Sequence, residues 1–509
     1  MARKQSSTTT HFSRREALRI LGIGTAGTLL SGVSQAVASP AEPGRVDVIV
    51  VGAGMAGLAA ARILRGQGKK IVVLEARDRV GGRVKAGKLA GHTIDLGGMW
   101  VGPTQTRLLD LLREYHIATM PQYLAGKGVI EIGGKRVTPE GEGFGFEPKA
   151  QAEMDRVLSE LDKLAASVPP DAPWTASHAE KWDDITLEQW HRENVHNDDV
   201  LRFLDTQARI DFTAEPWQLS FLYYLFYLKS GDSWMTLASY NNGAQMYIVP
   251  ESMHRVAAAI GKEIEESLVL AAPVSAILQD AKGVSAVSEK GTWQADHAIV
   301  ALPLPLSSRI RYQPALPTDR DALSQQMPMG SVIKFWVAYE KPFWRNHGMN
   351  GLLYTDTPPC SAMSEATPPS GSPGFLVGFI DGRRALKWSG RPMEERKKLA
   401  VDLIVKHFGP EGAKPIDYID QDWPADPWSR GCYGPSMGPG VLTTLGPALR
   451  TRFGRIHWAG TETSPIWTGY IEGAIRSGER AATEVLASYK NQARGTIEFS
   501  RPRNSLSLA

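Results

Sequence analysis

Short apolar runs alternate with longer amphipathic stretches from residue 46 onward. Residues 46–51 read Val-Asp-Val-Ile-Val-Val, and residues 71–74 read Ile-Val-Val-Leu. Short, continuous runs of branched apolar residues are typical of strands buried on both faces of a parallel sheet. The Ala-rich residues 58–65 between them favour a helix. The pattern therefore predicts a strand–helix–strand unit at the head of the folded chain.

Helical and strand patterns are mixed further along the chain. The predicted helices cover residues 149–167, 186–193, 200–210 and 394–408. The predicted strands cover residues 269–278, 297–302, 331–339 and 375–380, and a turn at 280–283 makes the first two a β-meander. Residues 357–373 are rich in Pro and Ser, which predicts a mobile surface loop. The aromatic run 221–228 is shorter than the roughly 20 residues that span a bilayer, which favours core over a membrane patch or a channel wall.

The composition is that of a large globular protein. At roughly 100 to 200 residues per domain, 509 residues suit two large domains or one two-lobed unit. A hydrophobic share of 42% and 14 Trp exclude a mainly disordered or coiled-coil chain, and a net charge of +3 requires no nucleic-acid partner. The two cysteines, Cys360 and Cys432, allow one disulfide but no disulfide scaffold or metal cluster, so we predict no metal site.

The N-terminal residues 1–38 have the parts of an export signal. Ser13-Arg14-Arg15-Glu-Ala-Leu precedes a weakly apolar run over 20–33 and the small residues Ala36-Val-Ala38. This order predicts a twin-arginine signal peptide, with a mature start near Ser39. We therefore expect the twin-arginine export machinery as a partner and a periplasmic or secreted location. The alternative is a basic, disordered N-terminus.

A glycine motif follows the first predicted strand. Gly52, Gly54 and Gly57 have the spacing G-x-G-x-x-G, and Glu75 ends the second strand. The first glycine allows a tight turn, the second lets the backbone approach a pyrophosphate, and the third lets helix and strand pack closely. The Glu75 carboxylate can bind both ribose hydroxyls. The motif predicts a dinucleotide site, and the alternative is a Gly-rich turn in an ordinary α/β unit.

Further motifs accompany this site over most of the chain. They are Glu75-Ala-Arg77-Asp-Arg79-Val-Gly-Gly-Arg83, Gly97-Gly98-Met99-Trp100-Val-Gly-Pro-Thr-Gln105, Gly330-Ser-Val-Ile-Lys334, Lys341-Pro-Phe-Trp344, Gly431-Cys432-Tyr433, and Gly460-Thr-Glu462-Thr continuing to Trp467-Thr-Gly-Tyr470-Ile471-Glu-Gly473. Their order and spacing resemble the flavin amine oxidase family, and most closely its monoamine oxidase branch.

The resemblance implies a fold. We expect an α/β protein in which a FAD-binding, Rossmann-like domain of the glutathione-reductase type is interleaved with an α+β substrate-binding domain. The FAD-binding domain would comprise 45–118, 248–307 and 425–489, and the substrate-binding domain 119–247 and 308–424. Residues 490–509 would form a polar C-terminal tail, unlike the anchoring helix that ends the mammalian relatives. We therefore expect no membrane anchor in the mature chain.

The resemblance also assigns catalytic side chains. Tyr433 and Tyr470 resemble a pair of facing rings on the substrate side of the flavin, which hold a cation and orient the neutral amine. Lys334 resembles a lysine that holds a water near the reactive flavin nitrogen, and burial would lower its pKa. The alternatives are two ordinary core tyrosines and a surface lysine at a strand end.

FAD is the implied cofactor. Its predicted contacts are Gly52, Gly54, Gly57, Glu75, Arg77, Arg83, Gly98, Met99, Trp100, Val274, Trp423, Cys432, Gly460, Glu462, Tyr470 and Ile471. Arg79 is a further candidate. Cys432 matches the cysteine that carries flavin on a thioether in the mammalian members, so covalent FAD is one expectation. A free thiol in a tight turn and a disulfide to Cys360 are the alternatives.

The implied reaction is the oxidation of a primary or secondary amine to an imine, which hydrolyses to an aldehyde, while oxygen becomes hydrogen peroxide. An L-amino acid oxidase is the nearest rival, but it needs a fixed Arg for the substrate carboxylate, and the residues that follow Gly97-Gly98 are Met99-Trp100 and not Arg. An Arg from another segment stays an alternative. Diamine or polyamine oxidation would need acidic residues along the channel. A redox-inactive flavoprotein that acts as a binding partner is an alternative from a different functional class. For the assembly of the protein, a homodimer is one alternative.

Overall fold

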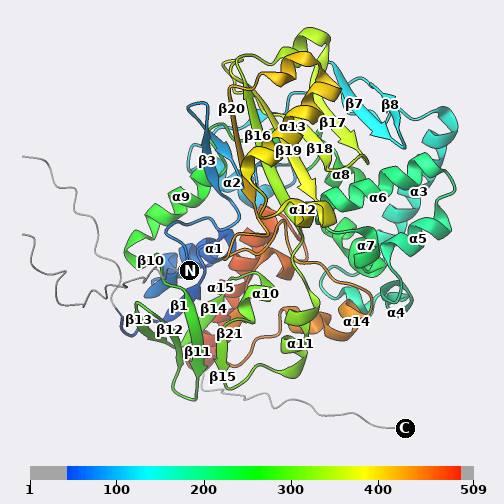
Figure 1. Cartoon of the computed structure of the whole chain (residues 1–509). Helices are drawn as coiled ribbons and strands as arrows, with labels where there is room; N and C mark the ends of the chain where they lie inside the picture. The colour runs from blue at the N-terminus through cyan, green and yellow to red at the C-terminus, as the bar shows by residue number, and fades with distance from the viewer. Residues whose placement is uncertain (1–42, 494–509) are drawn as a thin grey trace, which may run out of the picture. The chain divides into compact units, whose positions relative to one another are not determined.

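The predicted strand–helix–strand unit is present. The computed structural model describes residues 43–493, and the unit comprises β1 (Val48–Val51), α1 (Met55–Gly66) and β2 (Ile71–Leu74) (Figure 1). β1 lies between β2 and β14 (His297–Val300), and both pairings are parallel. β10 (Leu268–Val269) and β21 (Ile456–Trp458) complete a five-stranded sheet in the order β10-β2-β1-β14-β21.

Both faces of this sheet are buried, because side chains alternate along each strand. Val48 and Val50 pack with α1 and with α2 (Thr106–Glu114), α9 (His254–Glu263) and α15 (Ile471–Ala493). Ile49 and Val51 pack on the opposite face with β11 (Val274–Gln279), β12 (Val284–Ser288) and β13 (Gly291–Ala295). With both faces covered, the carboxyl ends of the strands are where a ligand can bind.

The meander differs from the prediction. Residues 269–278 are not one strand, because β10 ends at Val269 and β11 begins at Val274, beyond Pro273. β14 belongs to the parallel sheet instead of the meander, and its four residues are fully buried, as suits a central strand. The fourth strand beside β11 is β15 (Arg311–Gln313), so this sheet continues past the boundary predicted at residue 308.

A seven-stranded sheet forms the second β part of the molecule (Figure 1, yellow-green and yellow strands with cyan strands at one edge). Its strands, in spatial order, are β20 (Asp417–Asp422), β16 (Val332–Tyr339), β19 (Gly374–Asp381), β18 (Cys360–Glu365), β17 (Met349–Thr355), β7 (Lys127–Ile132) and β8 (Lys135–Val137). The predicted surface loop 357–373 was wrong, since β18 lies inside this range and pairs with strands on both sides. The prolines that suggested a loop flank β18 and are absent from it.

Helices cover one side of the seven-stranded sheet and form a region of their own beside it. α12 (Gly382–Trp388) packs on β16 and β19, and α13 (Met393–Phe408) packs on β16, β17 and β20. The helical region contains α3 (Pro148–Ala166), α4 (Ala179–Asp183), α5 (Leu187–Asn194), α6 (Asp198–Phe212), α7 (Phe221–Ser230), α8 (Trp234–Ala238), α11 (Thr318–Gln326) and α14 (Val441–Leu445). The aromatic run 221–228 is α7, and its burial confirms the core interpretation.

The remaining elements are short. They are β3 (Ala86–Leu89), β4 (His92–Asp95), β5 (Trp100–Val101), β6 (Met120–Pro121), β9 (Tyr247–Ile248) and α10 (Leu304–Ser307). Helix α15 extends to Ala493, so residues 490–493 are helical and not part of a tail as predicted. The predicted signal peptide and the rest of the tail lie outside the described residues.

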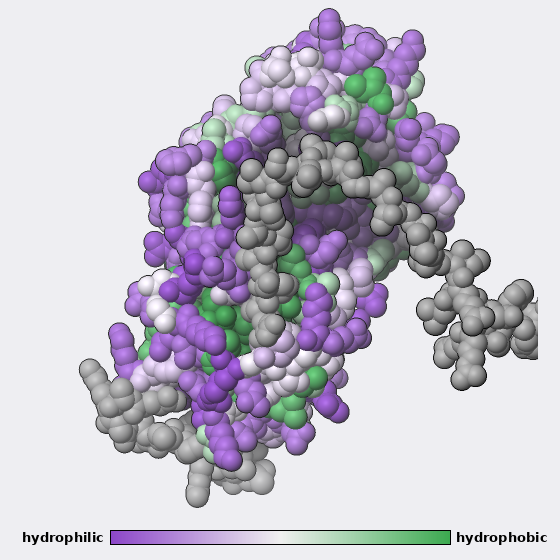
Figure 2. All heavy atoms as spheres, turned by 90° about the vertical axis from the view of Figure 1, so that its left-hand side faces the viewer, coloured by the Kyte–Doolittle hydropathy of each residue, from purple (hydrophilic) through white to green (hydrophobic). Residues whose placement is uncertain are grey.

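The surface is mostly hydrophilic on the face shown in Figure 2, with separate hydrophobic patches. Between residues 43 and 493, no helix combines the length and apolar character needed to cross a membrane.

Candidate active site

One cavity of about 640 Å³ connects the carboxyl ends of the parallel strands with the helical region. At one end it is lined by the β1–α1 turn, the end of β2, the start of β11 and the residues around α10. At the other end it is lined by residues of β7, α6, α7, β17 and the loop that contains Glu142. We call these the nucleotide end and the substrate chamber. Tyr433, Tyr470 and Lys334 also line this cavity.

The nucleotide end is shaped by the glycine motif. Gly54 caps α1 without a side-chain hydrogen bond, and a Cβ atom there would meet nothing within 4 Å. The N-terminal amides of α1 therefore face open space, which is the arrangement that binds a phosphate. Glu75 lines the cavity beside them, and its carboxylate accepts the amides of Ala53 at 2.7 Å and Arg77 at 2.9 Å.

Gly57 acts in packing. A Cβ atom on Gly57 would lie 1.9 Å from the carbonyl oxygen of Gly52, so only glycine lets α1 approach β1 this closely. Gly57 does not line the cavity, whereas Gly52 and Gly54 do. The structure thus separates the packing glycine of the motif from the two that face the cavity.

The three arginines after Glu75 have different partners. Arg77 lines the cavity and forms an ion pair with Asp426 at 2.7 Å. Arg83 also lines the cavity and donates to the carbonyl oxygen of Tyr433. Arg79 is not part of the lining, since its guanidinium donates to the carbonyl oxygens of Val80 and Gly82. Arg79 therefore stabilises its own loop and does not line the cavity, in contrast to the predicted cofactor contact.

Most of the other predicted cofactor contacts meet at this cavity. Those that line it are Gly98, Met99, Trp100, Val274, Trp423, Cys432, Gly460, Tyr470 and Ile471. Glu462 does not line it, contrary to the expectation of a direct contact. Its Oε1 accepts the amide of Leu304 at 3.2 Å, its Oε2 has no hydrogen-bond partner, and burial raises the pKa of this carboxyl. Glu462 belongs to the short 3-10 helix Thr461–Thr463 and is buried in the protein.

Lys334 lies in the middle of β16 and is 3% exposed, so the alternative of a surface lysine is wrong. Its Nζ donates to the carbonyl oxygen of Gly97 at 2.7 Å. Burial lowers the pKa of Lys334 to about 8, while the charge of Asp95 acts in the opposite direction. Burial in turn raises the pKa of Asp95 to about 7, although this carboxylate accepts hydrogen bonds from Ser252 and Met253. The lysine is thus buried, and the charge of Asp95 favours its protonated form.

The two predicted cage tyrosines come from distant segments. Tyr433 follows Cys432 through a cis peptide bond, and its ring meets Phe379 edge-on at 6.3 Å. Tyr470 immediately precedes α15, and its ring meets Trp467 edge-on at 4.9 Å. Within residues 43–493, no ring contact joins Tyr433 to Tyr470. Both rings line the cavity and each is fixed by its own neighbour.

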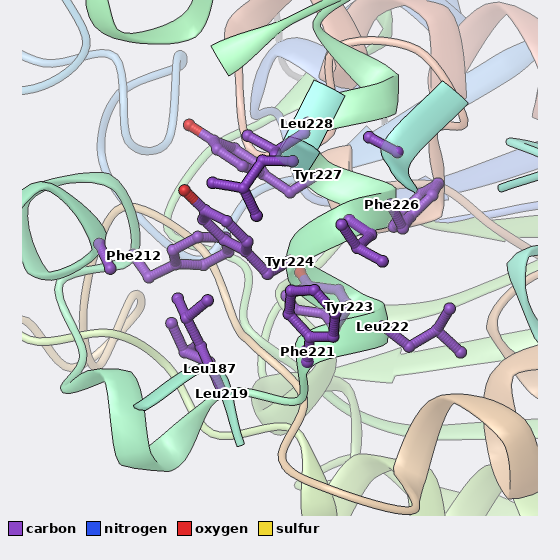
Figure 3. Packing of buried hydrophobic residues seen from close by; sticks show 14 of the residues in the cluster. Leu187, Phe212, Leu219, Phe221, Leu222, Tyr223, Tyr224, Phe226, Tyr227 and Leu228 are labelled. Carbon is purple, nitrogen blue, oxygen red and sulfur yellow. The ribbon is translucent and has the colours of Figure 1, made fainter. Parts of the chain in front are cut away.

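A third phenol extends this pair. Tyr227 of α7 lines the cavity, its hydroxyl lies 3.0 Å from the hydroxyl of Tyr470, and the two rings are stacked at 18°. Figure 3 shows Tyr224 and Tyr227 projecting from the same side of α7, beside Phe212 at the end of α6. The aromatic run was interpreted as core, and α7 is therefore both core and a wall of the substrate chamber.

Cys432 lies in the cavity wall as a free, buried thiol. Cys360 is also a free, buried thiol, but it lies inside β18 and does not line the cavity. The alternative of a disulfide between them is therefore wrong. Burial raises the pKa of the Cys432 thiol to about 11. Cys432 is positioned by its amide, which donates to the carbonyl oxygen of Gly330 at 3.0 Å.

Residues 55–486 match the family of flavin-containing amine oxidoreductases. The chain belongs to this family. It is 36% identical over 442 residues to a probable flavin-containing monoamine oxidase A of Dictyostelium discoideum, covering 86% of this chain and 97% of that one. It is also 36% identical over 455 residues to an L-amino acid dehydrogenase of Synechocystis, covering 86% of this chain and 94% of that one. Cyclohexylamine oxidase from Brevibacterium oxydans superposes with a TM-score of 0.82 at 32% identity, covering 87% of this chain and 99% of that one.

The comparisons confirm the predicted fold class and activity of this amine oxidase: it is an α/β flavoenzyme that oxidises amines with FAD. Its own residues fit that cofactor. The uncapped N-terminus of α1, the open space at Gly54 and the Glu75 carboxylate suit the phosphates and the ribose. Among residues 43–493, no group of His, Cys, Asp and Glu side chains is arranged to hold a metal ion.

Sequence reasoning missed several lining residues of this amine oxidase. Tyr227, Asp211 and Tyr354 line the substrate chamber but belong to no motif. Asp211 follows the predicted helix 200–210 directly, where an acidic residue ordinarily signals an exposed helix end. Only the packing of α6 against β7 and β17 turns it inward, so no local signal could have identified it.

Proposed function

We propose that this amine oxidase deaminates small primary or secondary amines that carry no carboxylate, with oxygen as the electron acceptor. The proposal is carried by the charge distribution along the cavity. The basic side chains of the lining are Arg77, Arg83, Arg309 and Lys334. The first two are engaged near the nucleotide end, and Arg309 follows α10 next to Ile310, which packs under the parallel sheet.

The substrate chamber has the opposite character. Its lining contains the carboxylates of Asp211 and Glu142 together with tyrosines, and no guanidinium. An amino acid substrate would place its carboxylate in this chamber without a partner, which costs several kcal/mol for a buried charge. A cationic amine meets aromatic faces and negative charge instead. The chamber therefore favours amines over amino acids, although one relative is an L-amino acid dehydrogenase.

The chain's own residues would orient the amine and hold the charges. Tyr433 and Tyr470 bind the ammonium on their faces and direct the neutral amine, once it has lost a proton, along the channel between them. The buried ammonium of Lys334 supplies one positive charge in a dry site, where it stabilises a nearby anion strongly. FAD, when bound, supplies the acceptor for the two electrons that leave the amine. A primary amine, oxygen and water give an aldehyde, ammonia and hydrogen peroxide in balance, and a secondary amine releases a primary amine in place of ammonia.

A peroxide-coupled assay of the purified holoenzyme tests this function. The panel contains phenylethylamine, pentylamine, cyclohexylamine and a secondary N-methylamine, with L-phenylalanine and L-tryptophan as carboxylate controls. We expect kcat/KM for the amines to exceed that for the amino acids by roughly a hundredfold or more. Faster oxidation of the amino acids would establish the L-amino acid oxidase alternative instead.

We also propose that Cys432 carries FAD covalently. Its place in the cavity wall and its match to the family's attachment cysteine support this. Acid precipitation of the holoenzyme should leave a yellow pellet, and Cys432→Ala should release the colour into the supernatant. A colourless wild-type pellet would contradict covalent attachment.

Export is the remaining part of the proposal. The sequence pattern of residues 1–38, which predicts a twin-arginine signal, supports the proposal of a periplasmic or secreted enzyme that acquires its cofactor before it leaves the cytoplasm.

A further inference from the structure

Asp211 is a carboxylate inside the substrate chamber. Phe203, Gln207, Ile210 and Asp211 all line the cavity, and their spacing places them on one face of α6. This face of the helix is directed into the chamber between α7 and β17. The wall of the substrate chamber therefore contributes a carboxylate from α6.

The surroundings of Asp211 leave its charge uncompensated. Its Oδ1 accepts one hydrogen bond, from the Gln207 amide at 2.8 Å, and in the described chain no protein group donates to its Oδ2. Other buried carboxylates of the protein have basic partners: Glu75 forms an ion pair with Arg77, Asp95 experiences the charge of Lys334, and Asp381 experiences the charges of Arg209 and Arg384. Asp211 also lies in the last turn of α6, where the helix dipole disfavours a negative charge.

Asp211 also lies close to the tyrosines of the cage. Burial and then the charge of Asp211 raise the pKa of Tyr470 and of Tyr354. Tyr227, which hydrogen-bonds to Tyr470, experiences the same charge. Tyr470 and Asp211 line the same cavity, so a molecule held at Tyr470 can extend toward the carboxylate.

The second carboxylate of the chamber is different. Glu142 accepts the amides of Tyr240 at 2.7 Å and Asn241 at 2.8 Å, one on each carboxylate oxygen. These bonds tie two loops together at the chamber wall. Both oxygens of Glu142 thus accept hydrogen bonds from the protein, whereas Asp211 lines the cavity with a hydrogen bond to only one of its oxygens in the described chain.

We propose that Asp211 is a specificity-determining residue that binds a second ammonium group of the substrate, so that the enzyme prefers α,ω-diamines to monoamines of the same length. The inference rests on the proposed amine oxidation and names its substrate class. The tyrosine cage holds the nitrogen that reacts, and Asp211 pairs with the nitrogen that does not. A monoamine would bury its apolar end against an unpaired carboxylate, which costs binding energy.

The test compares isosteric substrates on the holoenzyme. Butane-1,4-diamine is matched with pentylamine, and hexane-1,6-diamine with heptylamine, so that only a terminal ammonium replaces a methyl group. We expect wild-type enzyme to have the higher kcat/KM for at least one diamine, mainly through KM. In Asp211→Asn the ratio of diamine to monoamine kcat/KM should fall roughly tenfold or more, and Asp211→Glu should retain a diamine preference. Glu142→Gln is the matched control, and its ratio should stay within about twofold of wild type.

A second measurement does not depend on turnover. Under anaerobic conditions, diamine should raise the thermal unfolding midpoint of wild-type holoenzyme more than the matched monoamine does, and Asp211→Asn should remove that difference. If Asp211→Asn fails to fold, Asp211→Glu takes its place, and a shift in the preferred diamine length then supports the proposal.

Several outcomes would overturn the proposal. Equal wild-type use of diamines and monoamines would do so while leaving amine oxidation intact. If kcat/KM fell equally for the diamine and the matched monoamine in Asp211→Asn, the carboxylate would act on the reacting nitrogen. If the ratio of diamine to monoamine kcat/KM fell more in Glu142→Gln than in Asp211→Asn, the second ammonium would be assigned to Glu142. If no amine were oxidised at all, the proposed function would fail, and the absence of a diamine-specific thermal shift would then also exclude the second ammonium site.

Discussion

Single charged residues shape this site because burial shifts their protonation in opposite directions. Lys334 has its pKa lowered to about 8, and Asp211 has its pKa raised to about 7. Both shifts have the same main cause, since a charged group loses hydration when it is buried. The two residues lie in different parts of one cavity, so Lys334 places its positive charge, when protonated, near the cofactor region, and Asp211 places its negative charge, when ionised, in the substrate chamber.

Replacing Lys334 should slow the reaction of the reduced enzyme with oxygen. In Lys334→Met the buried positive charge is lost, and removal of such an electrostatic group costs on the order of a hundredfold. Stopped-flow mixing of anaerobically reduced enzyme with oxygen measures this rate. Lys85→Met is a suitable control, because Lys85 is partly buried nearby but bonds to Gln421 and does not line the cavity. Unchanged reoxidation in Lys334→Met would contradict the role.

Asp211 should make stability depend on pH in the absence of amine. Its pKa is about 7 in the folded chain and about 4 when unfolded, so the folded state holds the proton more tightly between these values. Stability therefore falls as pH rises from 4 to 7, and Asp211→Asn lacks this slope. The facing groups Gln207, Tyr227, Tyr354 and Tyr470 stay neutral in this range and add none.

Urea unfolding at several pH values measures this effect. As pH rises from 4 to 7, the free energy of unfolding of Asp211→Asn should increase relative to that of wild type by up to about 1 kcal/mol per pH unit. This value is discounted for the partial exposure of the carboxylate to the cavity. A difference between the two proteins that is the same at pH 5 and pH 7 would contradict the raised pKa.

At the scale of elements, helix α1 connects packing with cofactor binding. Gly54, the N-cap residue of α1, leaves open space at the cavity, and Gly57 in the first turn fixes the distance between α1 and β1. The same helix packs on α15, whose N-terminus lines the other side of the cavity. A displacement of α1 would therefore disturb both edges of the cofactor site.

A pair of Gly→Ala variants in α1 tests this arrangement. Gly57→Ala would place a Cβ atom 1.9 Å from the Gly52 carbonyl oxygen, so α1 must move away from β1, at a cost of about 1–3 kcal/mol and with loss of bound FAD. Gly66→Ala, at the exposed end of the same helix, meets nothing within 4 Å and should stabilise the protein by about 0.5–1 kcal/mol. Thermal unfolding and the ratio of flavin to protein absorbance measure both. Equal stability of the two variants would refute the packing role.

At the scale of the whole molecule, the chain crosses repeatedly between its two β parts. β1 and β2 precede β7 of the seven-stranded sheet, β14 returns to the parallel sheet, and β21 follows β20. The cavity lies where these crossings meet, so its two ends are built from segments hundreds of residues apart. Such a site exists only in the fully folded chain, which is consistent with an export route that transports folded proteins.

Changing the arginine pair should therefore retain the protein inside the cell. In the native host, the wild-type enzyme should begin near Ser39 and occur in the periplasm or the medium. The double change Arg14→Lys with Arg15→Lys should leave full-length chain in the cytoplasm, whereas changing Arg3 and Lys4 should not. N-terminal sequencing of each fraction decides this, and an intact Met1 on exported wild-type protein would contradict the signal.

The sequence by itself determined the features that depend on neighbouring residues. Alternation and spacing specified the first βαβ unit, the glycine turn and the strand that carries Lys334, because local backbone preferences and side-chain burial are encoded within a few residues. The motifs named the residues that meet at the cavity, since each motif is itself a local geometry.

Only the tertiary structure decided the features that depend on contacts between distant segments. β18 became a central strand despite its Pro-rich flanks, because strands on both sides paired with it. Glu462 and Arg79 turned away from the cavity, while Tyr227 and Asp211 turned toward it. The direction of a side chain relative to a cavity is set by which elements pack around it, and that packing joins residues that no local pattern relates.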